Sequence, residues 1–453
     1  MLAQTSSSLK DLMTIGAATN SSSPSDPNNW LKRVDQAIRN SESPEQLLPY
    51  VQGVYALMAS EDWAPFMDAL VADAQMASKL RLNQGRVRSL WGVTPIINLI
   101  QAVKAERSIG HEAESLVFVT YHTTAAFDIN LNTHANAVEA KDPSASMAFY
   151  WLVLVWVLIA YDAVFFFNDR GVLPAVESTG NLAMGIRREE LSLLRRAKKL
   201  IYTVPYGADY RTREPTLKRS RFNFCMDCPA IGKYCFCNSD VWGIVFYTTK
   251  AFATSMLSSG LAIDQLPGSR RLEHVVIDAK SIKPNYPKAW TGRNLRVLHI
   301  PNHPHFKGTR YLKDALDRLG DSAPIEFIEA TGVSNEHAHE LMHEADVVVD
   351  QLIGGYFGMT ALEAMAHGKP VISYIVDPSI VLAPDECPII NANPDTIFDV
   401  LEGLVEGQYA LENIGRRSRE YVEQHYSVEA LAERLHALFS DTANIDLRAL
   451  KQG

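Results

Sequence analysis

Two doubly wound α/β domains, preceded by a helical extension, are the fold class that the sequence predicts. Apolar strands alternate with amphipathic helices from about residue 84 to 288, and again from 289 to 426. A stretch rich in Pro and Gly, SIKPNYPKAWTGRN (281–294), separates the two series. With 453 residues, the chain is also too long for one hydrophobic core.

The first 83 residues precede this alternating pattern. Residues 1–29 are polar and lack the basic and apolar regions of a secretory signal, so we expect a disordered tail and a cytoplasmic protein. Residues 30–83 carry apolar side chains at three- and four-residue intervals, which predicts a helical extension. A packing or oligomerisation element is the plainest interpretation of this extension.

The first alternating series predicts a parallel sheet. A strand at 85–92, a helix at 93–110 and a strand at 113–121 form a unit whose length fits a right-handed crossover. Further strands are predicted at 162–169, 198–207, 241–249 and 273–279. Between them, residues 147–160 are uninterruptedly apolar, but about 14 residues fall short of the roughly 20 that span a membrane. A buried helix is therefore favoured over a membrane or interfacial segment.

The overall charge argues against one class of partner. The formal net charge is -9 and the sequence pI is about 5.8. Binding of nucleic acid in general requires a basic face that neutralises phosphates. We therefore expect no nucleic acid partner.

The second series begins with a strand at 294–303 that is followed by the loop HPHFKGT. Backbone N–H groups at a Gly turn and a nearby ammonium favour an anion, so Lys307 is a candidate diphosphate contact, although a solvated loop lysine fits the spacing equally well. His299, His303 and His305 suggest a metal. A single loop without an acidic partner makes that interpretation the weaker one.

A helix with one carboxylate follows the predicted strand at 346–352. The sequence GGYFGMTALEAMAHGKPV places a Gly-rich turn before the helix and Glu363 one turn inside it. Helix N-termini favour anions, so Gly358, Met359 and Thr360 are candidate phosphate contacts. A carboxylate at Glu363 is able to accept hydrogen bonds from a ribose diol. A Glu that only stabilises the helix start is the alternative.

These segments resemble a known family. GYFGMTALEAMAHGKPVISY is similar to the donor-binding motif of the GT-B glycosyltransferases, in particular glycosyltransferase family 4 (group 1). HPHFKGT, HEADVVVDQL, VPYGADYRT and YVEQHYSVEALAERLHALF resemble further family segments, so that the resemblance covers about residues 85–440. It implies a GT-B fold, with two Rossmann-like domains facing a cleft, and retaining transfer of a sugar from a nucleotide donor without an essential metal.

By this resemblance, Glu363 binds the ribose and Lys307, beside Gly308, binds the diphosphate. The family's first motif Glu, which touches the donor sugar, corresponds to Gly355. The basic residue before the Lys corresponds to Asn302, for which His303 or Arg310 is a candidate substitute. No protein base is evident, so electrostatic stabilisation of the departing diphosphate by Lys307 is the expected catalytic effect. The turn YGADYRT adds two candidate acceptor or sugar contacts, Asp209 and Arg211; a turn Asp paired with a nearby Arg is the alternative.

A cysteine group forms the second informative motif. CMDCPAIGKYCFC places four thiols as C-x-x-C, six residues, then C-x-C, a spacing that suits a structural zinc site: Cys225, Cys228, Cys235 and Cys237. Free thiols or a redox pair are the alternatives. The preceding segment 211–224 has five Lys and Arg and one acid, which fits a solvated loop or a patch for an anionic acceptor or a membrane surface.

The predicted organisation has five parts, with boundaries as follows: a tail at 1–29, a helical extension at 30–83, an acceptor-side domain at 84–288 with a Cys-rich insertion at about 212–240, a nucleotide-sugar domain at 289–426, and a terminal helix and tail at 427–453. The predicted function is transfer of a hexose-type sugar from a UDP-, GDP- or ADP-sugar to a glycan or lipid acceptor, as in polysaccharide biosynthesis. A non-catalytic nucleotide-binding or assembly module and a sugar-nucleotide epimerase are the alternatives.

Overall fold

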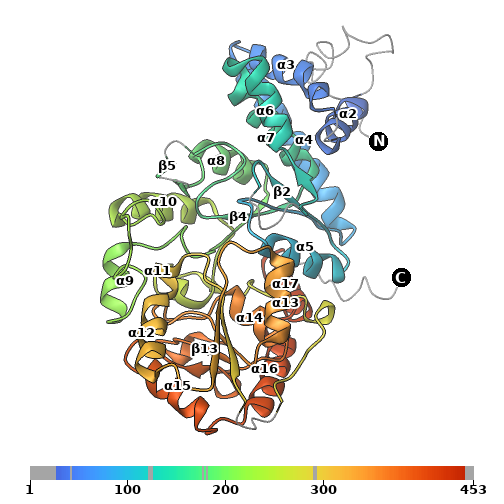
Figure 1. Cartoon of the computed structure of the whole chain (residues 1–453). Helices are drawn as coiled ribbons and strands as arrows, with labels where there is room; N and C mark the ends of the chain where they lie inside the picture. The colour runs from blue at the N-terminus through green and yellow to red at the C-terminus, as the bar shows by residue number, and fades with distance from the viewer. Residues whose placement is uncertain are drawn as a thin grey trace. The chain divides into compact units, whose positions relative to one another are not determined.

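The computed structural model of the chain describes residues 27–40, 43–120, 126–175, 178–179, 182–288 and 293–443 (Figure 1). Of the predicted tail at 1–29, only residues 27–29 are among them, and the prediction for the others lies outside the described residues. The chain divides into two compact units. Unit 1 comprises Met1–Asp209, Gly243–Leu257 and Leu435–Gly453, and unit 2 comprises Tyr210–Trp242 and Ser258–Arg434.

The first sheet has seven strands in the order β3-β2-β1-β4-β7-β8-β9, and its pairs from β3 to β8 are parallel. The order reverses direction between β1 and β4, as in a doubly wound sheet. A separate antiparallel pair joins β5 to β6. The strands are β1 (Arg88–Val93), β2 (Glu112–Val117), β3 (Ile129–Asn130), β4 (Ala163–Phe167), β5 (Ser178–Thr179), β6 (Leu182–Ala183), β7 (Leu200–Val204), β8 (Ser255–Ser258) and β9 (Arg270–Arg271).

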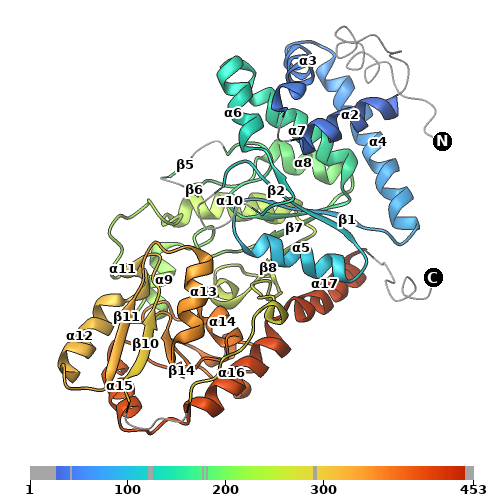
Figure 2. The same ribbon diagram turned by 45° about the vertical axis from the view of Figure 1, so that its right-hand side comes forward.

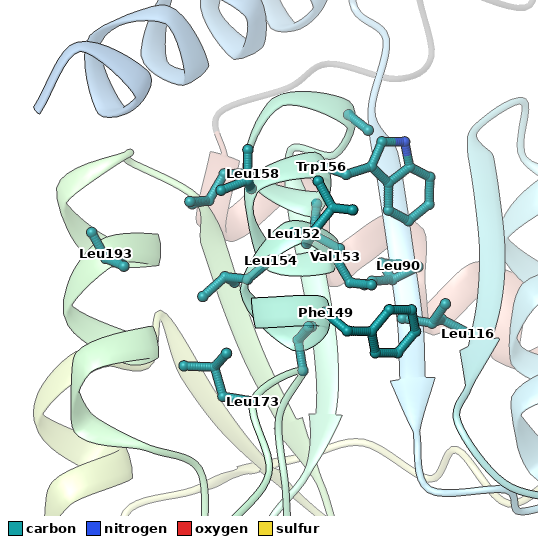
Figure 3. Packing of buried hydrophobic residues seen from close by; sticks show 14 of the residues in the cluster. Leu90, Leu116, Phe149, Leu152, Val153, Leu154, Trp156, Leu158, Leu173 and Leu193 are labelled. Carbon is teal, nitrogen blue, oxygen red and sulfur yellow. The ribbon is translucent and has the colours of Figure 1, made fainter. Parts of the chain in front are cut away.

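The predicted helical extension is present and packs into the core of unit 1. Its helices contact α7, whose side chains are mostly buried. In Figure 3, Phe149 and Val153 of α7 lie beside Leu90 of the sheet. The helices of this unit are α2 (Pro27–Arg39), α3 (Leu48–Met58), α4 (Trp63–Asn83), α5 (Asn98–Ser108), α6 (Asn132–Lys141), α7 (Ser146–Ala160) and α8 (Arg188–Arg196), with the short 3₁₀ helices η1 (Pro44–Leu47) and η2 (Pro143–Ala145).

The apolar run is a core helix. Pro143–Ala160 is long and apolar enough to cross a membrane by length and composition, and 61% of it is buried inside the protein. Ion pairs and hydrogen bonds fix its C-terminal end: Arg81 of α4 holds the buried Asp162 at 2.8 Å and donates to the carbonyl of Ile159. These contacts agree with the predicted buried helix.

Two predicted strands in the first series are wrong. Residues 241–249 lie in helix α10 (Ser239–Phe252), although their β-branched and aromatic composition is typical of strands. The side chain of Asn238 accepts hydrogen bonds from the N–H groups of Asp240 and Val241, as a helix N-cap does. Residues 273–279 contribute only an isolated bridge, from Ile277 to Ser427.

Unit 2 contains the second doubly wound sheet, a five-stranded parallel sheet in the order β11-β10-β12-β13-β14. The predicted strands at 294–303 and 346–352 and the predicted helix around Glu363 are present. The strands are β10 (Leu295–His299), β11 (Ile325–Glu329), β12 (Val347–Val349), β13 (Val371–Ser373) and β14 (Ile390–Asn391).

Helices cover both faces of this sheet (Figures 1 and 2). One apolar cluster joins it to α13, α14 and α16, and another joins it to α12 and α15. The helices are α9 (Arg213–Arg219), α11 (Pro304–Lys307), α12 (Thr309–Leu319), α13 (Asn335–Glu344), α14 (Met359–Ala366), α15 (Ile397–Val405) and α16 (Leu411–His425), with the 3₁₀ helices η3 (Gly260–Asp264), η4 (Ala279–Ser281), η5 (Pro378–Ile380) and η6 (Pro384–Glu386). Helix α17 (Val428–Ala443) begins in unit 2 and continues into unit 1 from Leu435.

The Cys-rich segment packs within unit 2. Tyr210–Trp242 belongs to this unit, whereas the sequence-based boundaries assign residues 212–240 to the first domain. Phe222 shares an apolar cluster with Ile353 and Tyr374, and Arg310 forms an ion pair with Asp227 at 2.6 Å. The segment therefore borders the loop that follows β12.

Candidate functional site

The carboxyl ends of β10 and β12 bring several predicted donor-site residues together. The two strands are neighbours, but the chain leaves them for opposite edges of the sheet, so a ligand crevice is expected between them. Lys307 follows β10 and Gly358 follows β12. The Nζ atom of Lys307 lies 3.3 Å from the position that a Cβ atom at Gly358 would take.

Lys307 is fixed by a carboxylate that the sequence analysis did not single out. Its Nζ donates to Oδ1 of Asp350 at 2.5 Å, and the Asp350 side chain is fully buried. Gly308 adopts the left-handed conformation (φ 75°) that ends α11 and starts α12, so a glycine is suited to this turn. The Lys307 side chain remains 17% exposed.

The Asp350 carboxylate also binds the N-terminus of α14. The N–H of Gly358, the N-cap residue, donates to Oδ2 of Asp350 at 2.6 Å. Met359 and Thr360 form the first turn, where backbone N–H groups have no intrahelical partner. One carboxylate thus holds both the ammonium and the first N–H that were predicted to receive phosphate.

Glu363 lies one turn further along α14 and is 7% exposed. Its Oε1 accepts a long hydrogen bond of 3.4 Å from Nδ2 of Asn335 and lies 3.9 Å from Nε2 of His339. Burial raises the pKa of the Glu363 carboxyl to about 7; the nearby Asp350 charge raises it further, and Asn335 and Lys307 oppose the rise. Its oxygens therefore have acceptor capacity left for a ligand.

The three loop histidines have different environments. His299 is buried, with Nδ1 2.8 Å from the carbonyl of Val349 and Nε2 2.8 Å from Oγ1 of Thr309, so it joins β10 to β12 and α12. His303 is the N-cap residue of α11, and its ring, like that of His305, packs against Tyr234. Burial and the neighbouring His305 and Lys307 lower the pKa of His303, so it is neutral at neutral pH.

Asp209 lies in unit 1 and is completely buried. It accepts four hydrogen bonds of 2.8–3.0 Å, from the backbone and side-chain amides of Asn168 and from the N–H groups of Tyr206 and Gly207. Burial and the neighbouring Asp169 raise its pKa to about 7 against these donors. The arrangement fixes a turn between the ends of β4 and β7.

Arg211 lies in unit 2, so the structure assigns the two residues of the YGADYRT turn to different units. Its guanidinium stacks over Phe224 at 4.1 Å and donates to Sγ of Cys235 at 3.3 Å. It lines a small cavity together with Arg219, Asn223 and Gly355. Gly355 has a φ of 80°, a conformation that Glu, the family's residue here, rarely adopts.

The zinc prediction is not supported by the structure. In the part of the chain that the structure describes, no group of three or more His, Cys, Asp or Glu side chains is placed to hold a metal ion. The four thiols are free, and Sγ of Cys237 accepts a hydrogen bond from the N–H of Gly232. Burial raises the pKa of Cys225 to about 11, which disfavours its thiolate in the absence of a metal.

The structure thus gathers Lys307, Gly308, Gly358 and Glu363 around Asp350. Sequence reasoning missed Asp350, His339 and His367. The end of a buried strand, DVVVDQL, was a signal for Asp350, because ligand-facing residues follow such strands. The spacing of histidines along α13 was a weaker signal for His339.

Several solved structures are similar to the chain at low sequence identity. Among solved structures, the chain is similar to Alr3699/HepE from Anabaena, crystallised with UDP and glucose (12% identity, 78% of this chain and 100% of that chain, TM-score 0.48). It is similar to sucrose-phosphate synthase from Thermosynechococcus elongatus (11%, 79% and 99%, TM-score 0.45) and to AviGT4 of avilamycin A biosynthesis (11%, 79% and 98%, TM-score 0.42). No curated protein matches the chain.

One family model matches part of the chain. It is described as glycosyl transferases group 1, and the match covers residues 293–406. This range contains Lys307, Asp350, Gly358 and Glu363, together with the surrounding strands β10 to β14. The predicted donor-site residues of unit 2 therefore lie within the segment that matches the group 1 glycosyl transferases.

Proposed function

We propose that the protein is a glycosyltransferase that moves a hexose-type sugar, with retention, from a nucleotide-sugar donor to a glycan or lipid acceptor. The observation that carries this proposal is the match of residues 293–406 to the group 1 family, together with the cluster of Lys307, Gly358 and Glu363 inside that range. A role in polysaccharide biosynthesis at the cytoplasmic face of a membrane belongs to the same proposal.

In this proposal, Glu363 accepts hydrogen bonds from the ribose diol, and the N–H groups of Met359 and Thr360 receive a phosphate oxygen. Lys307 neutralises the diphosphate, with Gly308 allowing the close turn. Asp350 uses one of the three N–H donors of the ammonium, so two remain for phosphate oxygens. Stabilisation of the departing diphosphate is then the main catalytic effect.

The other predicted site residues, Arg211, Asp209 and His303, have different roles in this proposal. Arg211 lines a cavity beside Gly355, so its guanidinium is suited to contact the donor sugar or the acceptor. Asp209 already accepts four N–H hydrogen bonds, and we assign it a structural role. His303 lies at the N-terminus of α11 and, as a neutral imidazole, is suited to donate a hydrogen bond rather than a charge.

Two observations favour a second candidate, a nucleotide-binding module without catalysis. Gly355 replaces the carboxylate expected at the donor sugar, and Asp350 holds two of the groups expected to bind the diphosphate. A protein of this kind would bind the nucleotide part of the donor but would not cleave the glycosidic bond.

Calorimetry with UDP, GDP, ADP and UDP-glucose tests the pocket. We expect one nucleotide to bind in the micromolar range and Glu363→Ala to weaken it at least tenfold, whereas Glu340→Ala, which removes an exposed carboxylate of α13, leaves the affinity unchanged. Absence of binding by the wild type to every nucleotide would contradict the proposal. Slow hydrolysis of a bound nucleotide sugar then separates the enzyme from the binding module.

The four-cysteine zinc site stays a prediction. Arg211 donates to Sγ of Cys235, and the N–H of Gly232 donates to Sγ of Cys237. Metal-bound thiolates commonly accept such hydrogen bonds, but a free thiol accepts them as well. Metal analysis of freshly purified protein decides the matter. One zinc per chain supports the site, and a content near zero excludes it.

A further inference from the structure

A pair of histidines lies beside Glu363. Nδ1 of His339, on α13, is 2.9 Å from Nε2 of His367, which follows α14. The opposite nitrogen of the same ring, Nε2 of His339, lies 3.9 Å from Oε1 of Glu363. The His339 imidazole thus stands between His367 and the carboxylate, one ring nitrogen toward each.

The contact between the two rings decides where their protons lie. At 2.9 Å the two nitrogens share one hydrogen, so one ring donates and the other accepts. Nδ1 of His367 is buried without a hydrogen-bond partner among the described residues. A buried N–H without a partner is the rarer arrangement, so Nδ1 carries no proton and the proton of His367 is on Nε2. His367 therefore donates, and the proton of His339 is on Nε2, toward Glu363.

The groups around the two rings favour the same direction of the hydrogen bond, from His367 to His339. The pKa of His367 is lowered to about 4, mainly by burial and further by the neighbouring groups His339, His343, Lys369 and Arg419. His367 is therefore neutral at neutral pH. Burial also lowers the pKa of His339. The groups that face Glu363 are His339 and Asn335 from α13, Asp350 after β12 and Lys307 after β10. Of these, His339 and Asn335 present N–H groups toward its Oε1 atom.

We infer that His339 is a positioning residue for Glu363: oriented by His367, it directs an N–H at the carboxylate and keeps it ionised for a nucleotide ribose. The 3.9 Å separation leaves room for a bridging water or a small ring rotation when the ligand is bound. This inference rests on the proposed function, since it concerns the same ribose contact. It makes nucleotide affinity depend on pH around neutrality.

The direction of this dependence follows from the chemistry. The ribose diol donates to the ionised carboxylate, so affinity is highest above the pKa of Glu363, about 7, and falls below it. Removal of the His339 N–H raises this pKa further and moves the fall to higher pH. UDP-glucose is a suitable probe, because its diphosphate is a diester that does not titrate between pH 5 and 9.

The experiment measures the affinity for UDP-glucose from pH 5.5 to 8.5 by calorimetry. For the wild type we expect a loss of about tenfold between pH 8 and pH 6, and for Glu363→Gln a flat profile. His339→Phe is expected to bind about threefold to tenfold more weakly than the wild type at pH 7, with the difference shrinking at pH 8.5. His339→Gln, which keeps an N–H donor, is expected to stay within about twofold.

His337→Phe is the matched control, because His337 lies on the same helix but is exposed and pairs with Glu340. Its profile should superimpose on that of the wild type. The inference is overturned if the profiles of His339→Phe and the wild type superimpose, or if His339→Gln is as weak as His339→Phe. Circular dichroism at each pH verifies that the variants are folded.

A ligand-free measurement separates this inference from the proposed function. If the wild type binds no nucleotide, the coupling between His339 and Glu363 is still measurable by urea unfolding. The effect of His339→Phe on the folding equilibrium constant should change between pH 5 and pH 8. In a Glu363→Gln background this change should be at least threefold smaller, because only the titration of His339 itself, whose pKa burial lowers, remains. An effect independent of pH, or one unaltered by Glu363→Gln, overturns the inference whatever the nucleotide result.

Discussion

Two buried carboxylates, one in each unit, have the same raised pKa and opposite surroundings. Asp209 in unit 1 and Glu363 in unit 2 both have a pKa of about 7, mainly because they are buried. Asp209 accepts four N–H hydrogen bonds, whereas Glu363 accepts a single long one from Asn335. A perturbed pKa therefore does not distinguish a structural carboxylate from a ligand-binding one; the unused acceptor capacity does.

The largest expected effect is at Asp209. Asp209→Ala leaves the buried donors of Asn168, Tyr206 and Gly207 without an acceptor and should lower the free energy of unfolding by about 3 kcal/mol or more. Asp209→Asn should cost less, because the unpartnered Oδ1 of Asn168 is able to turn toward the new amide. Urea unfolding measures both. Equal, small losses would mean that these hydrogen bonds do not stabilise the turn.

A second effect concerns the ion pair of unit 2. Lys307→Met leaves Asp350 buried with only the Gly358 N–H, so we expect a loss of about 2–3 kcal/mol of unfolding free energy. Adding Asp350→Asn should recover most of this loss without restoring nucleotide binding. Lys313→Met, at an exposed lysine paired with Glu329, is the control and should change stability by less than about 1 kcal/mol. Failure of the double variant to recover stability would mean that charge is not the cause.

A substitution at Gly355 tests whether the backbone at this position tolerates a side chain. Gly355→Ala places a side chain at a φ of 80° and should lower the unfolding free energy by about 1–2 kcal/mol. Gly110→Ala is the control for strain alone, since its φ is 92° and no atom of the described residues lies within 4 Å of the added carbon. If Gly355→Ala were neutral, the turn would tolerate the family's Glu.

The smallest expected effect is a dependence on pH. Glu363 has a folded pKa of about 7 and a lower unfolded one, so its contribution to stability is present below about pH 4.5 and is lost as the pH rises to 7. Glu363→Gln should therefore equal the wild type near pH 4 and exceed it at pH 5.5 by about 1 kcal/mol. Unfolding curves at the two pH values measure this difference. A constant difference would mean that Glu363 titrates normally.

Sequence patterns predicted the second sheet better than the first. The strands predicted at 294–303 and 346–352 are apolar runs bounded by polar loops, and they contain β10 and β12. The strand predicted at 241–249 failed because an N-cap at Asn238 and burial of Trp242 and Phe246, four residues apart, favour a helix over local propensity.

Only those candidate site residues that lie within sequence motifs were predicted. Lys307, Gly358 and Glu363 belong to recognisable segments, so they were named from the sequence. Asp350 acts through Lys307, 43 positions away, and His339 contacts His367, 28 positions away. Such pairs depend on which strands and helices become neighbours, and no local pattern contains that information.

The Asp350 carboxylate has one further consequence, for ionic strength. A lysine in an anion site normally attracts phosphate over a distance and makes binding strongly dependent on salt. Here the charge of Lys307 is already balanced by a buried group that salt does not screen. In the proposed site, the ammonium keeps two N–H donors for a diphosphate while Asp350 balances its charge. Recognition of the diphosphate should therefore depend on contact geometry more than on long-range attraction, and added salt should change it little.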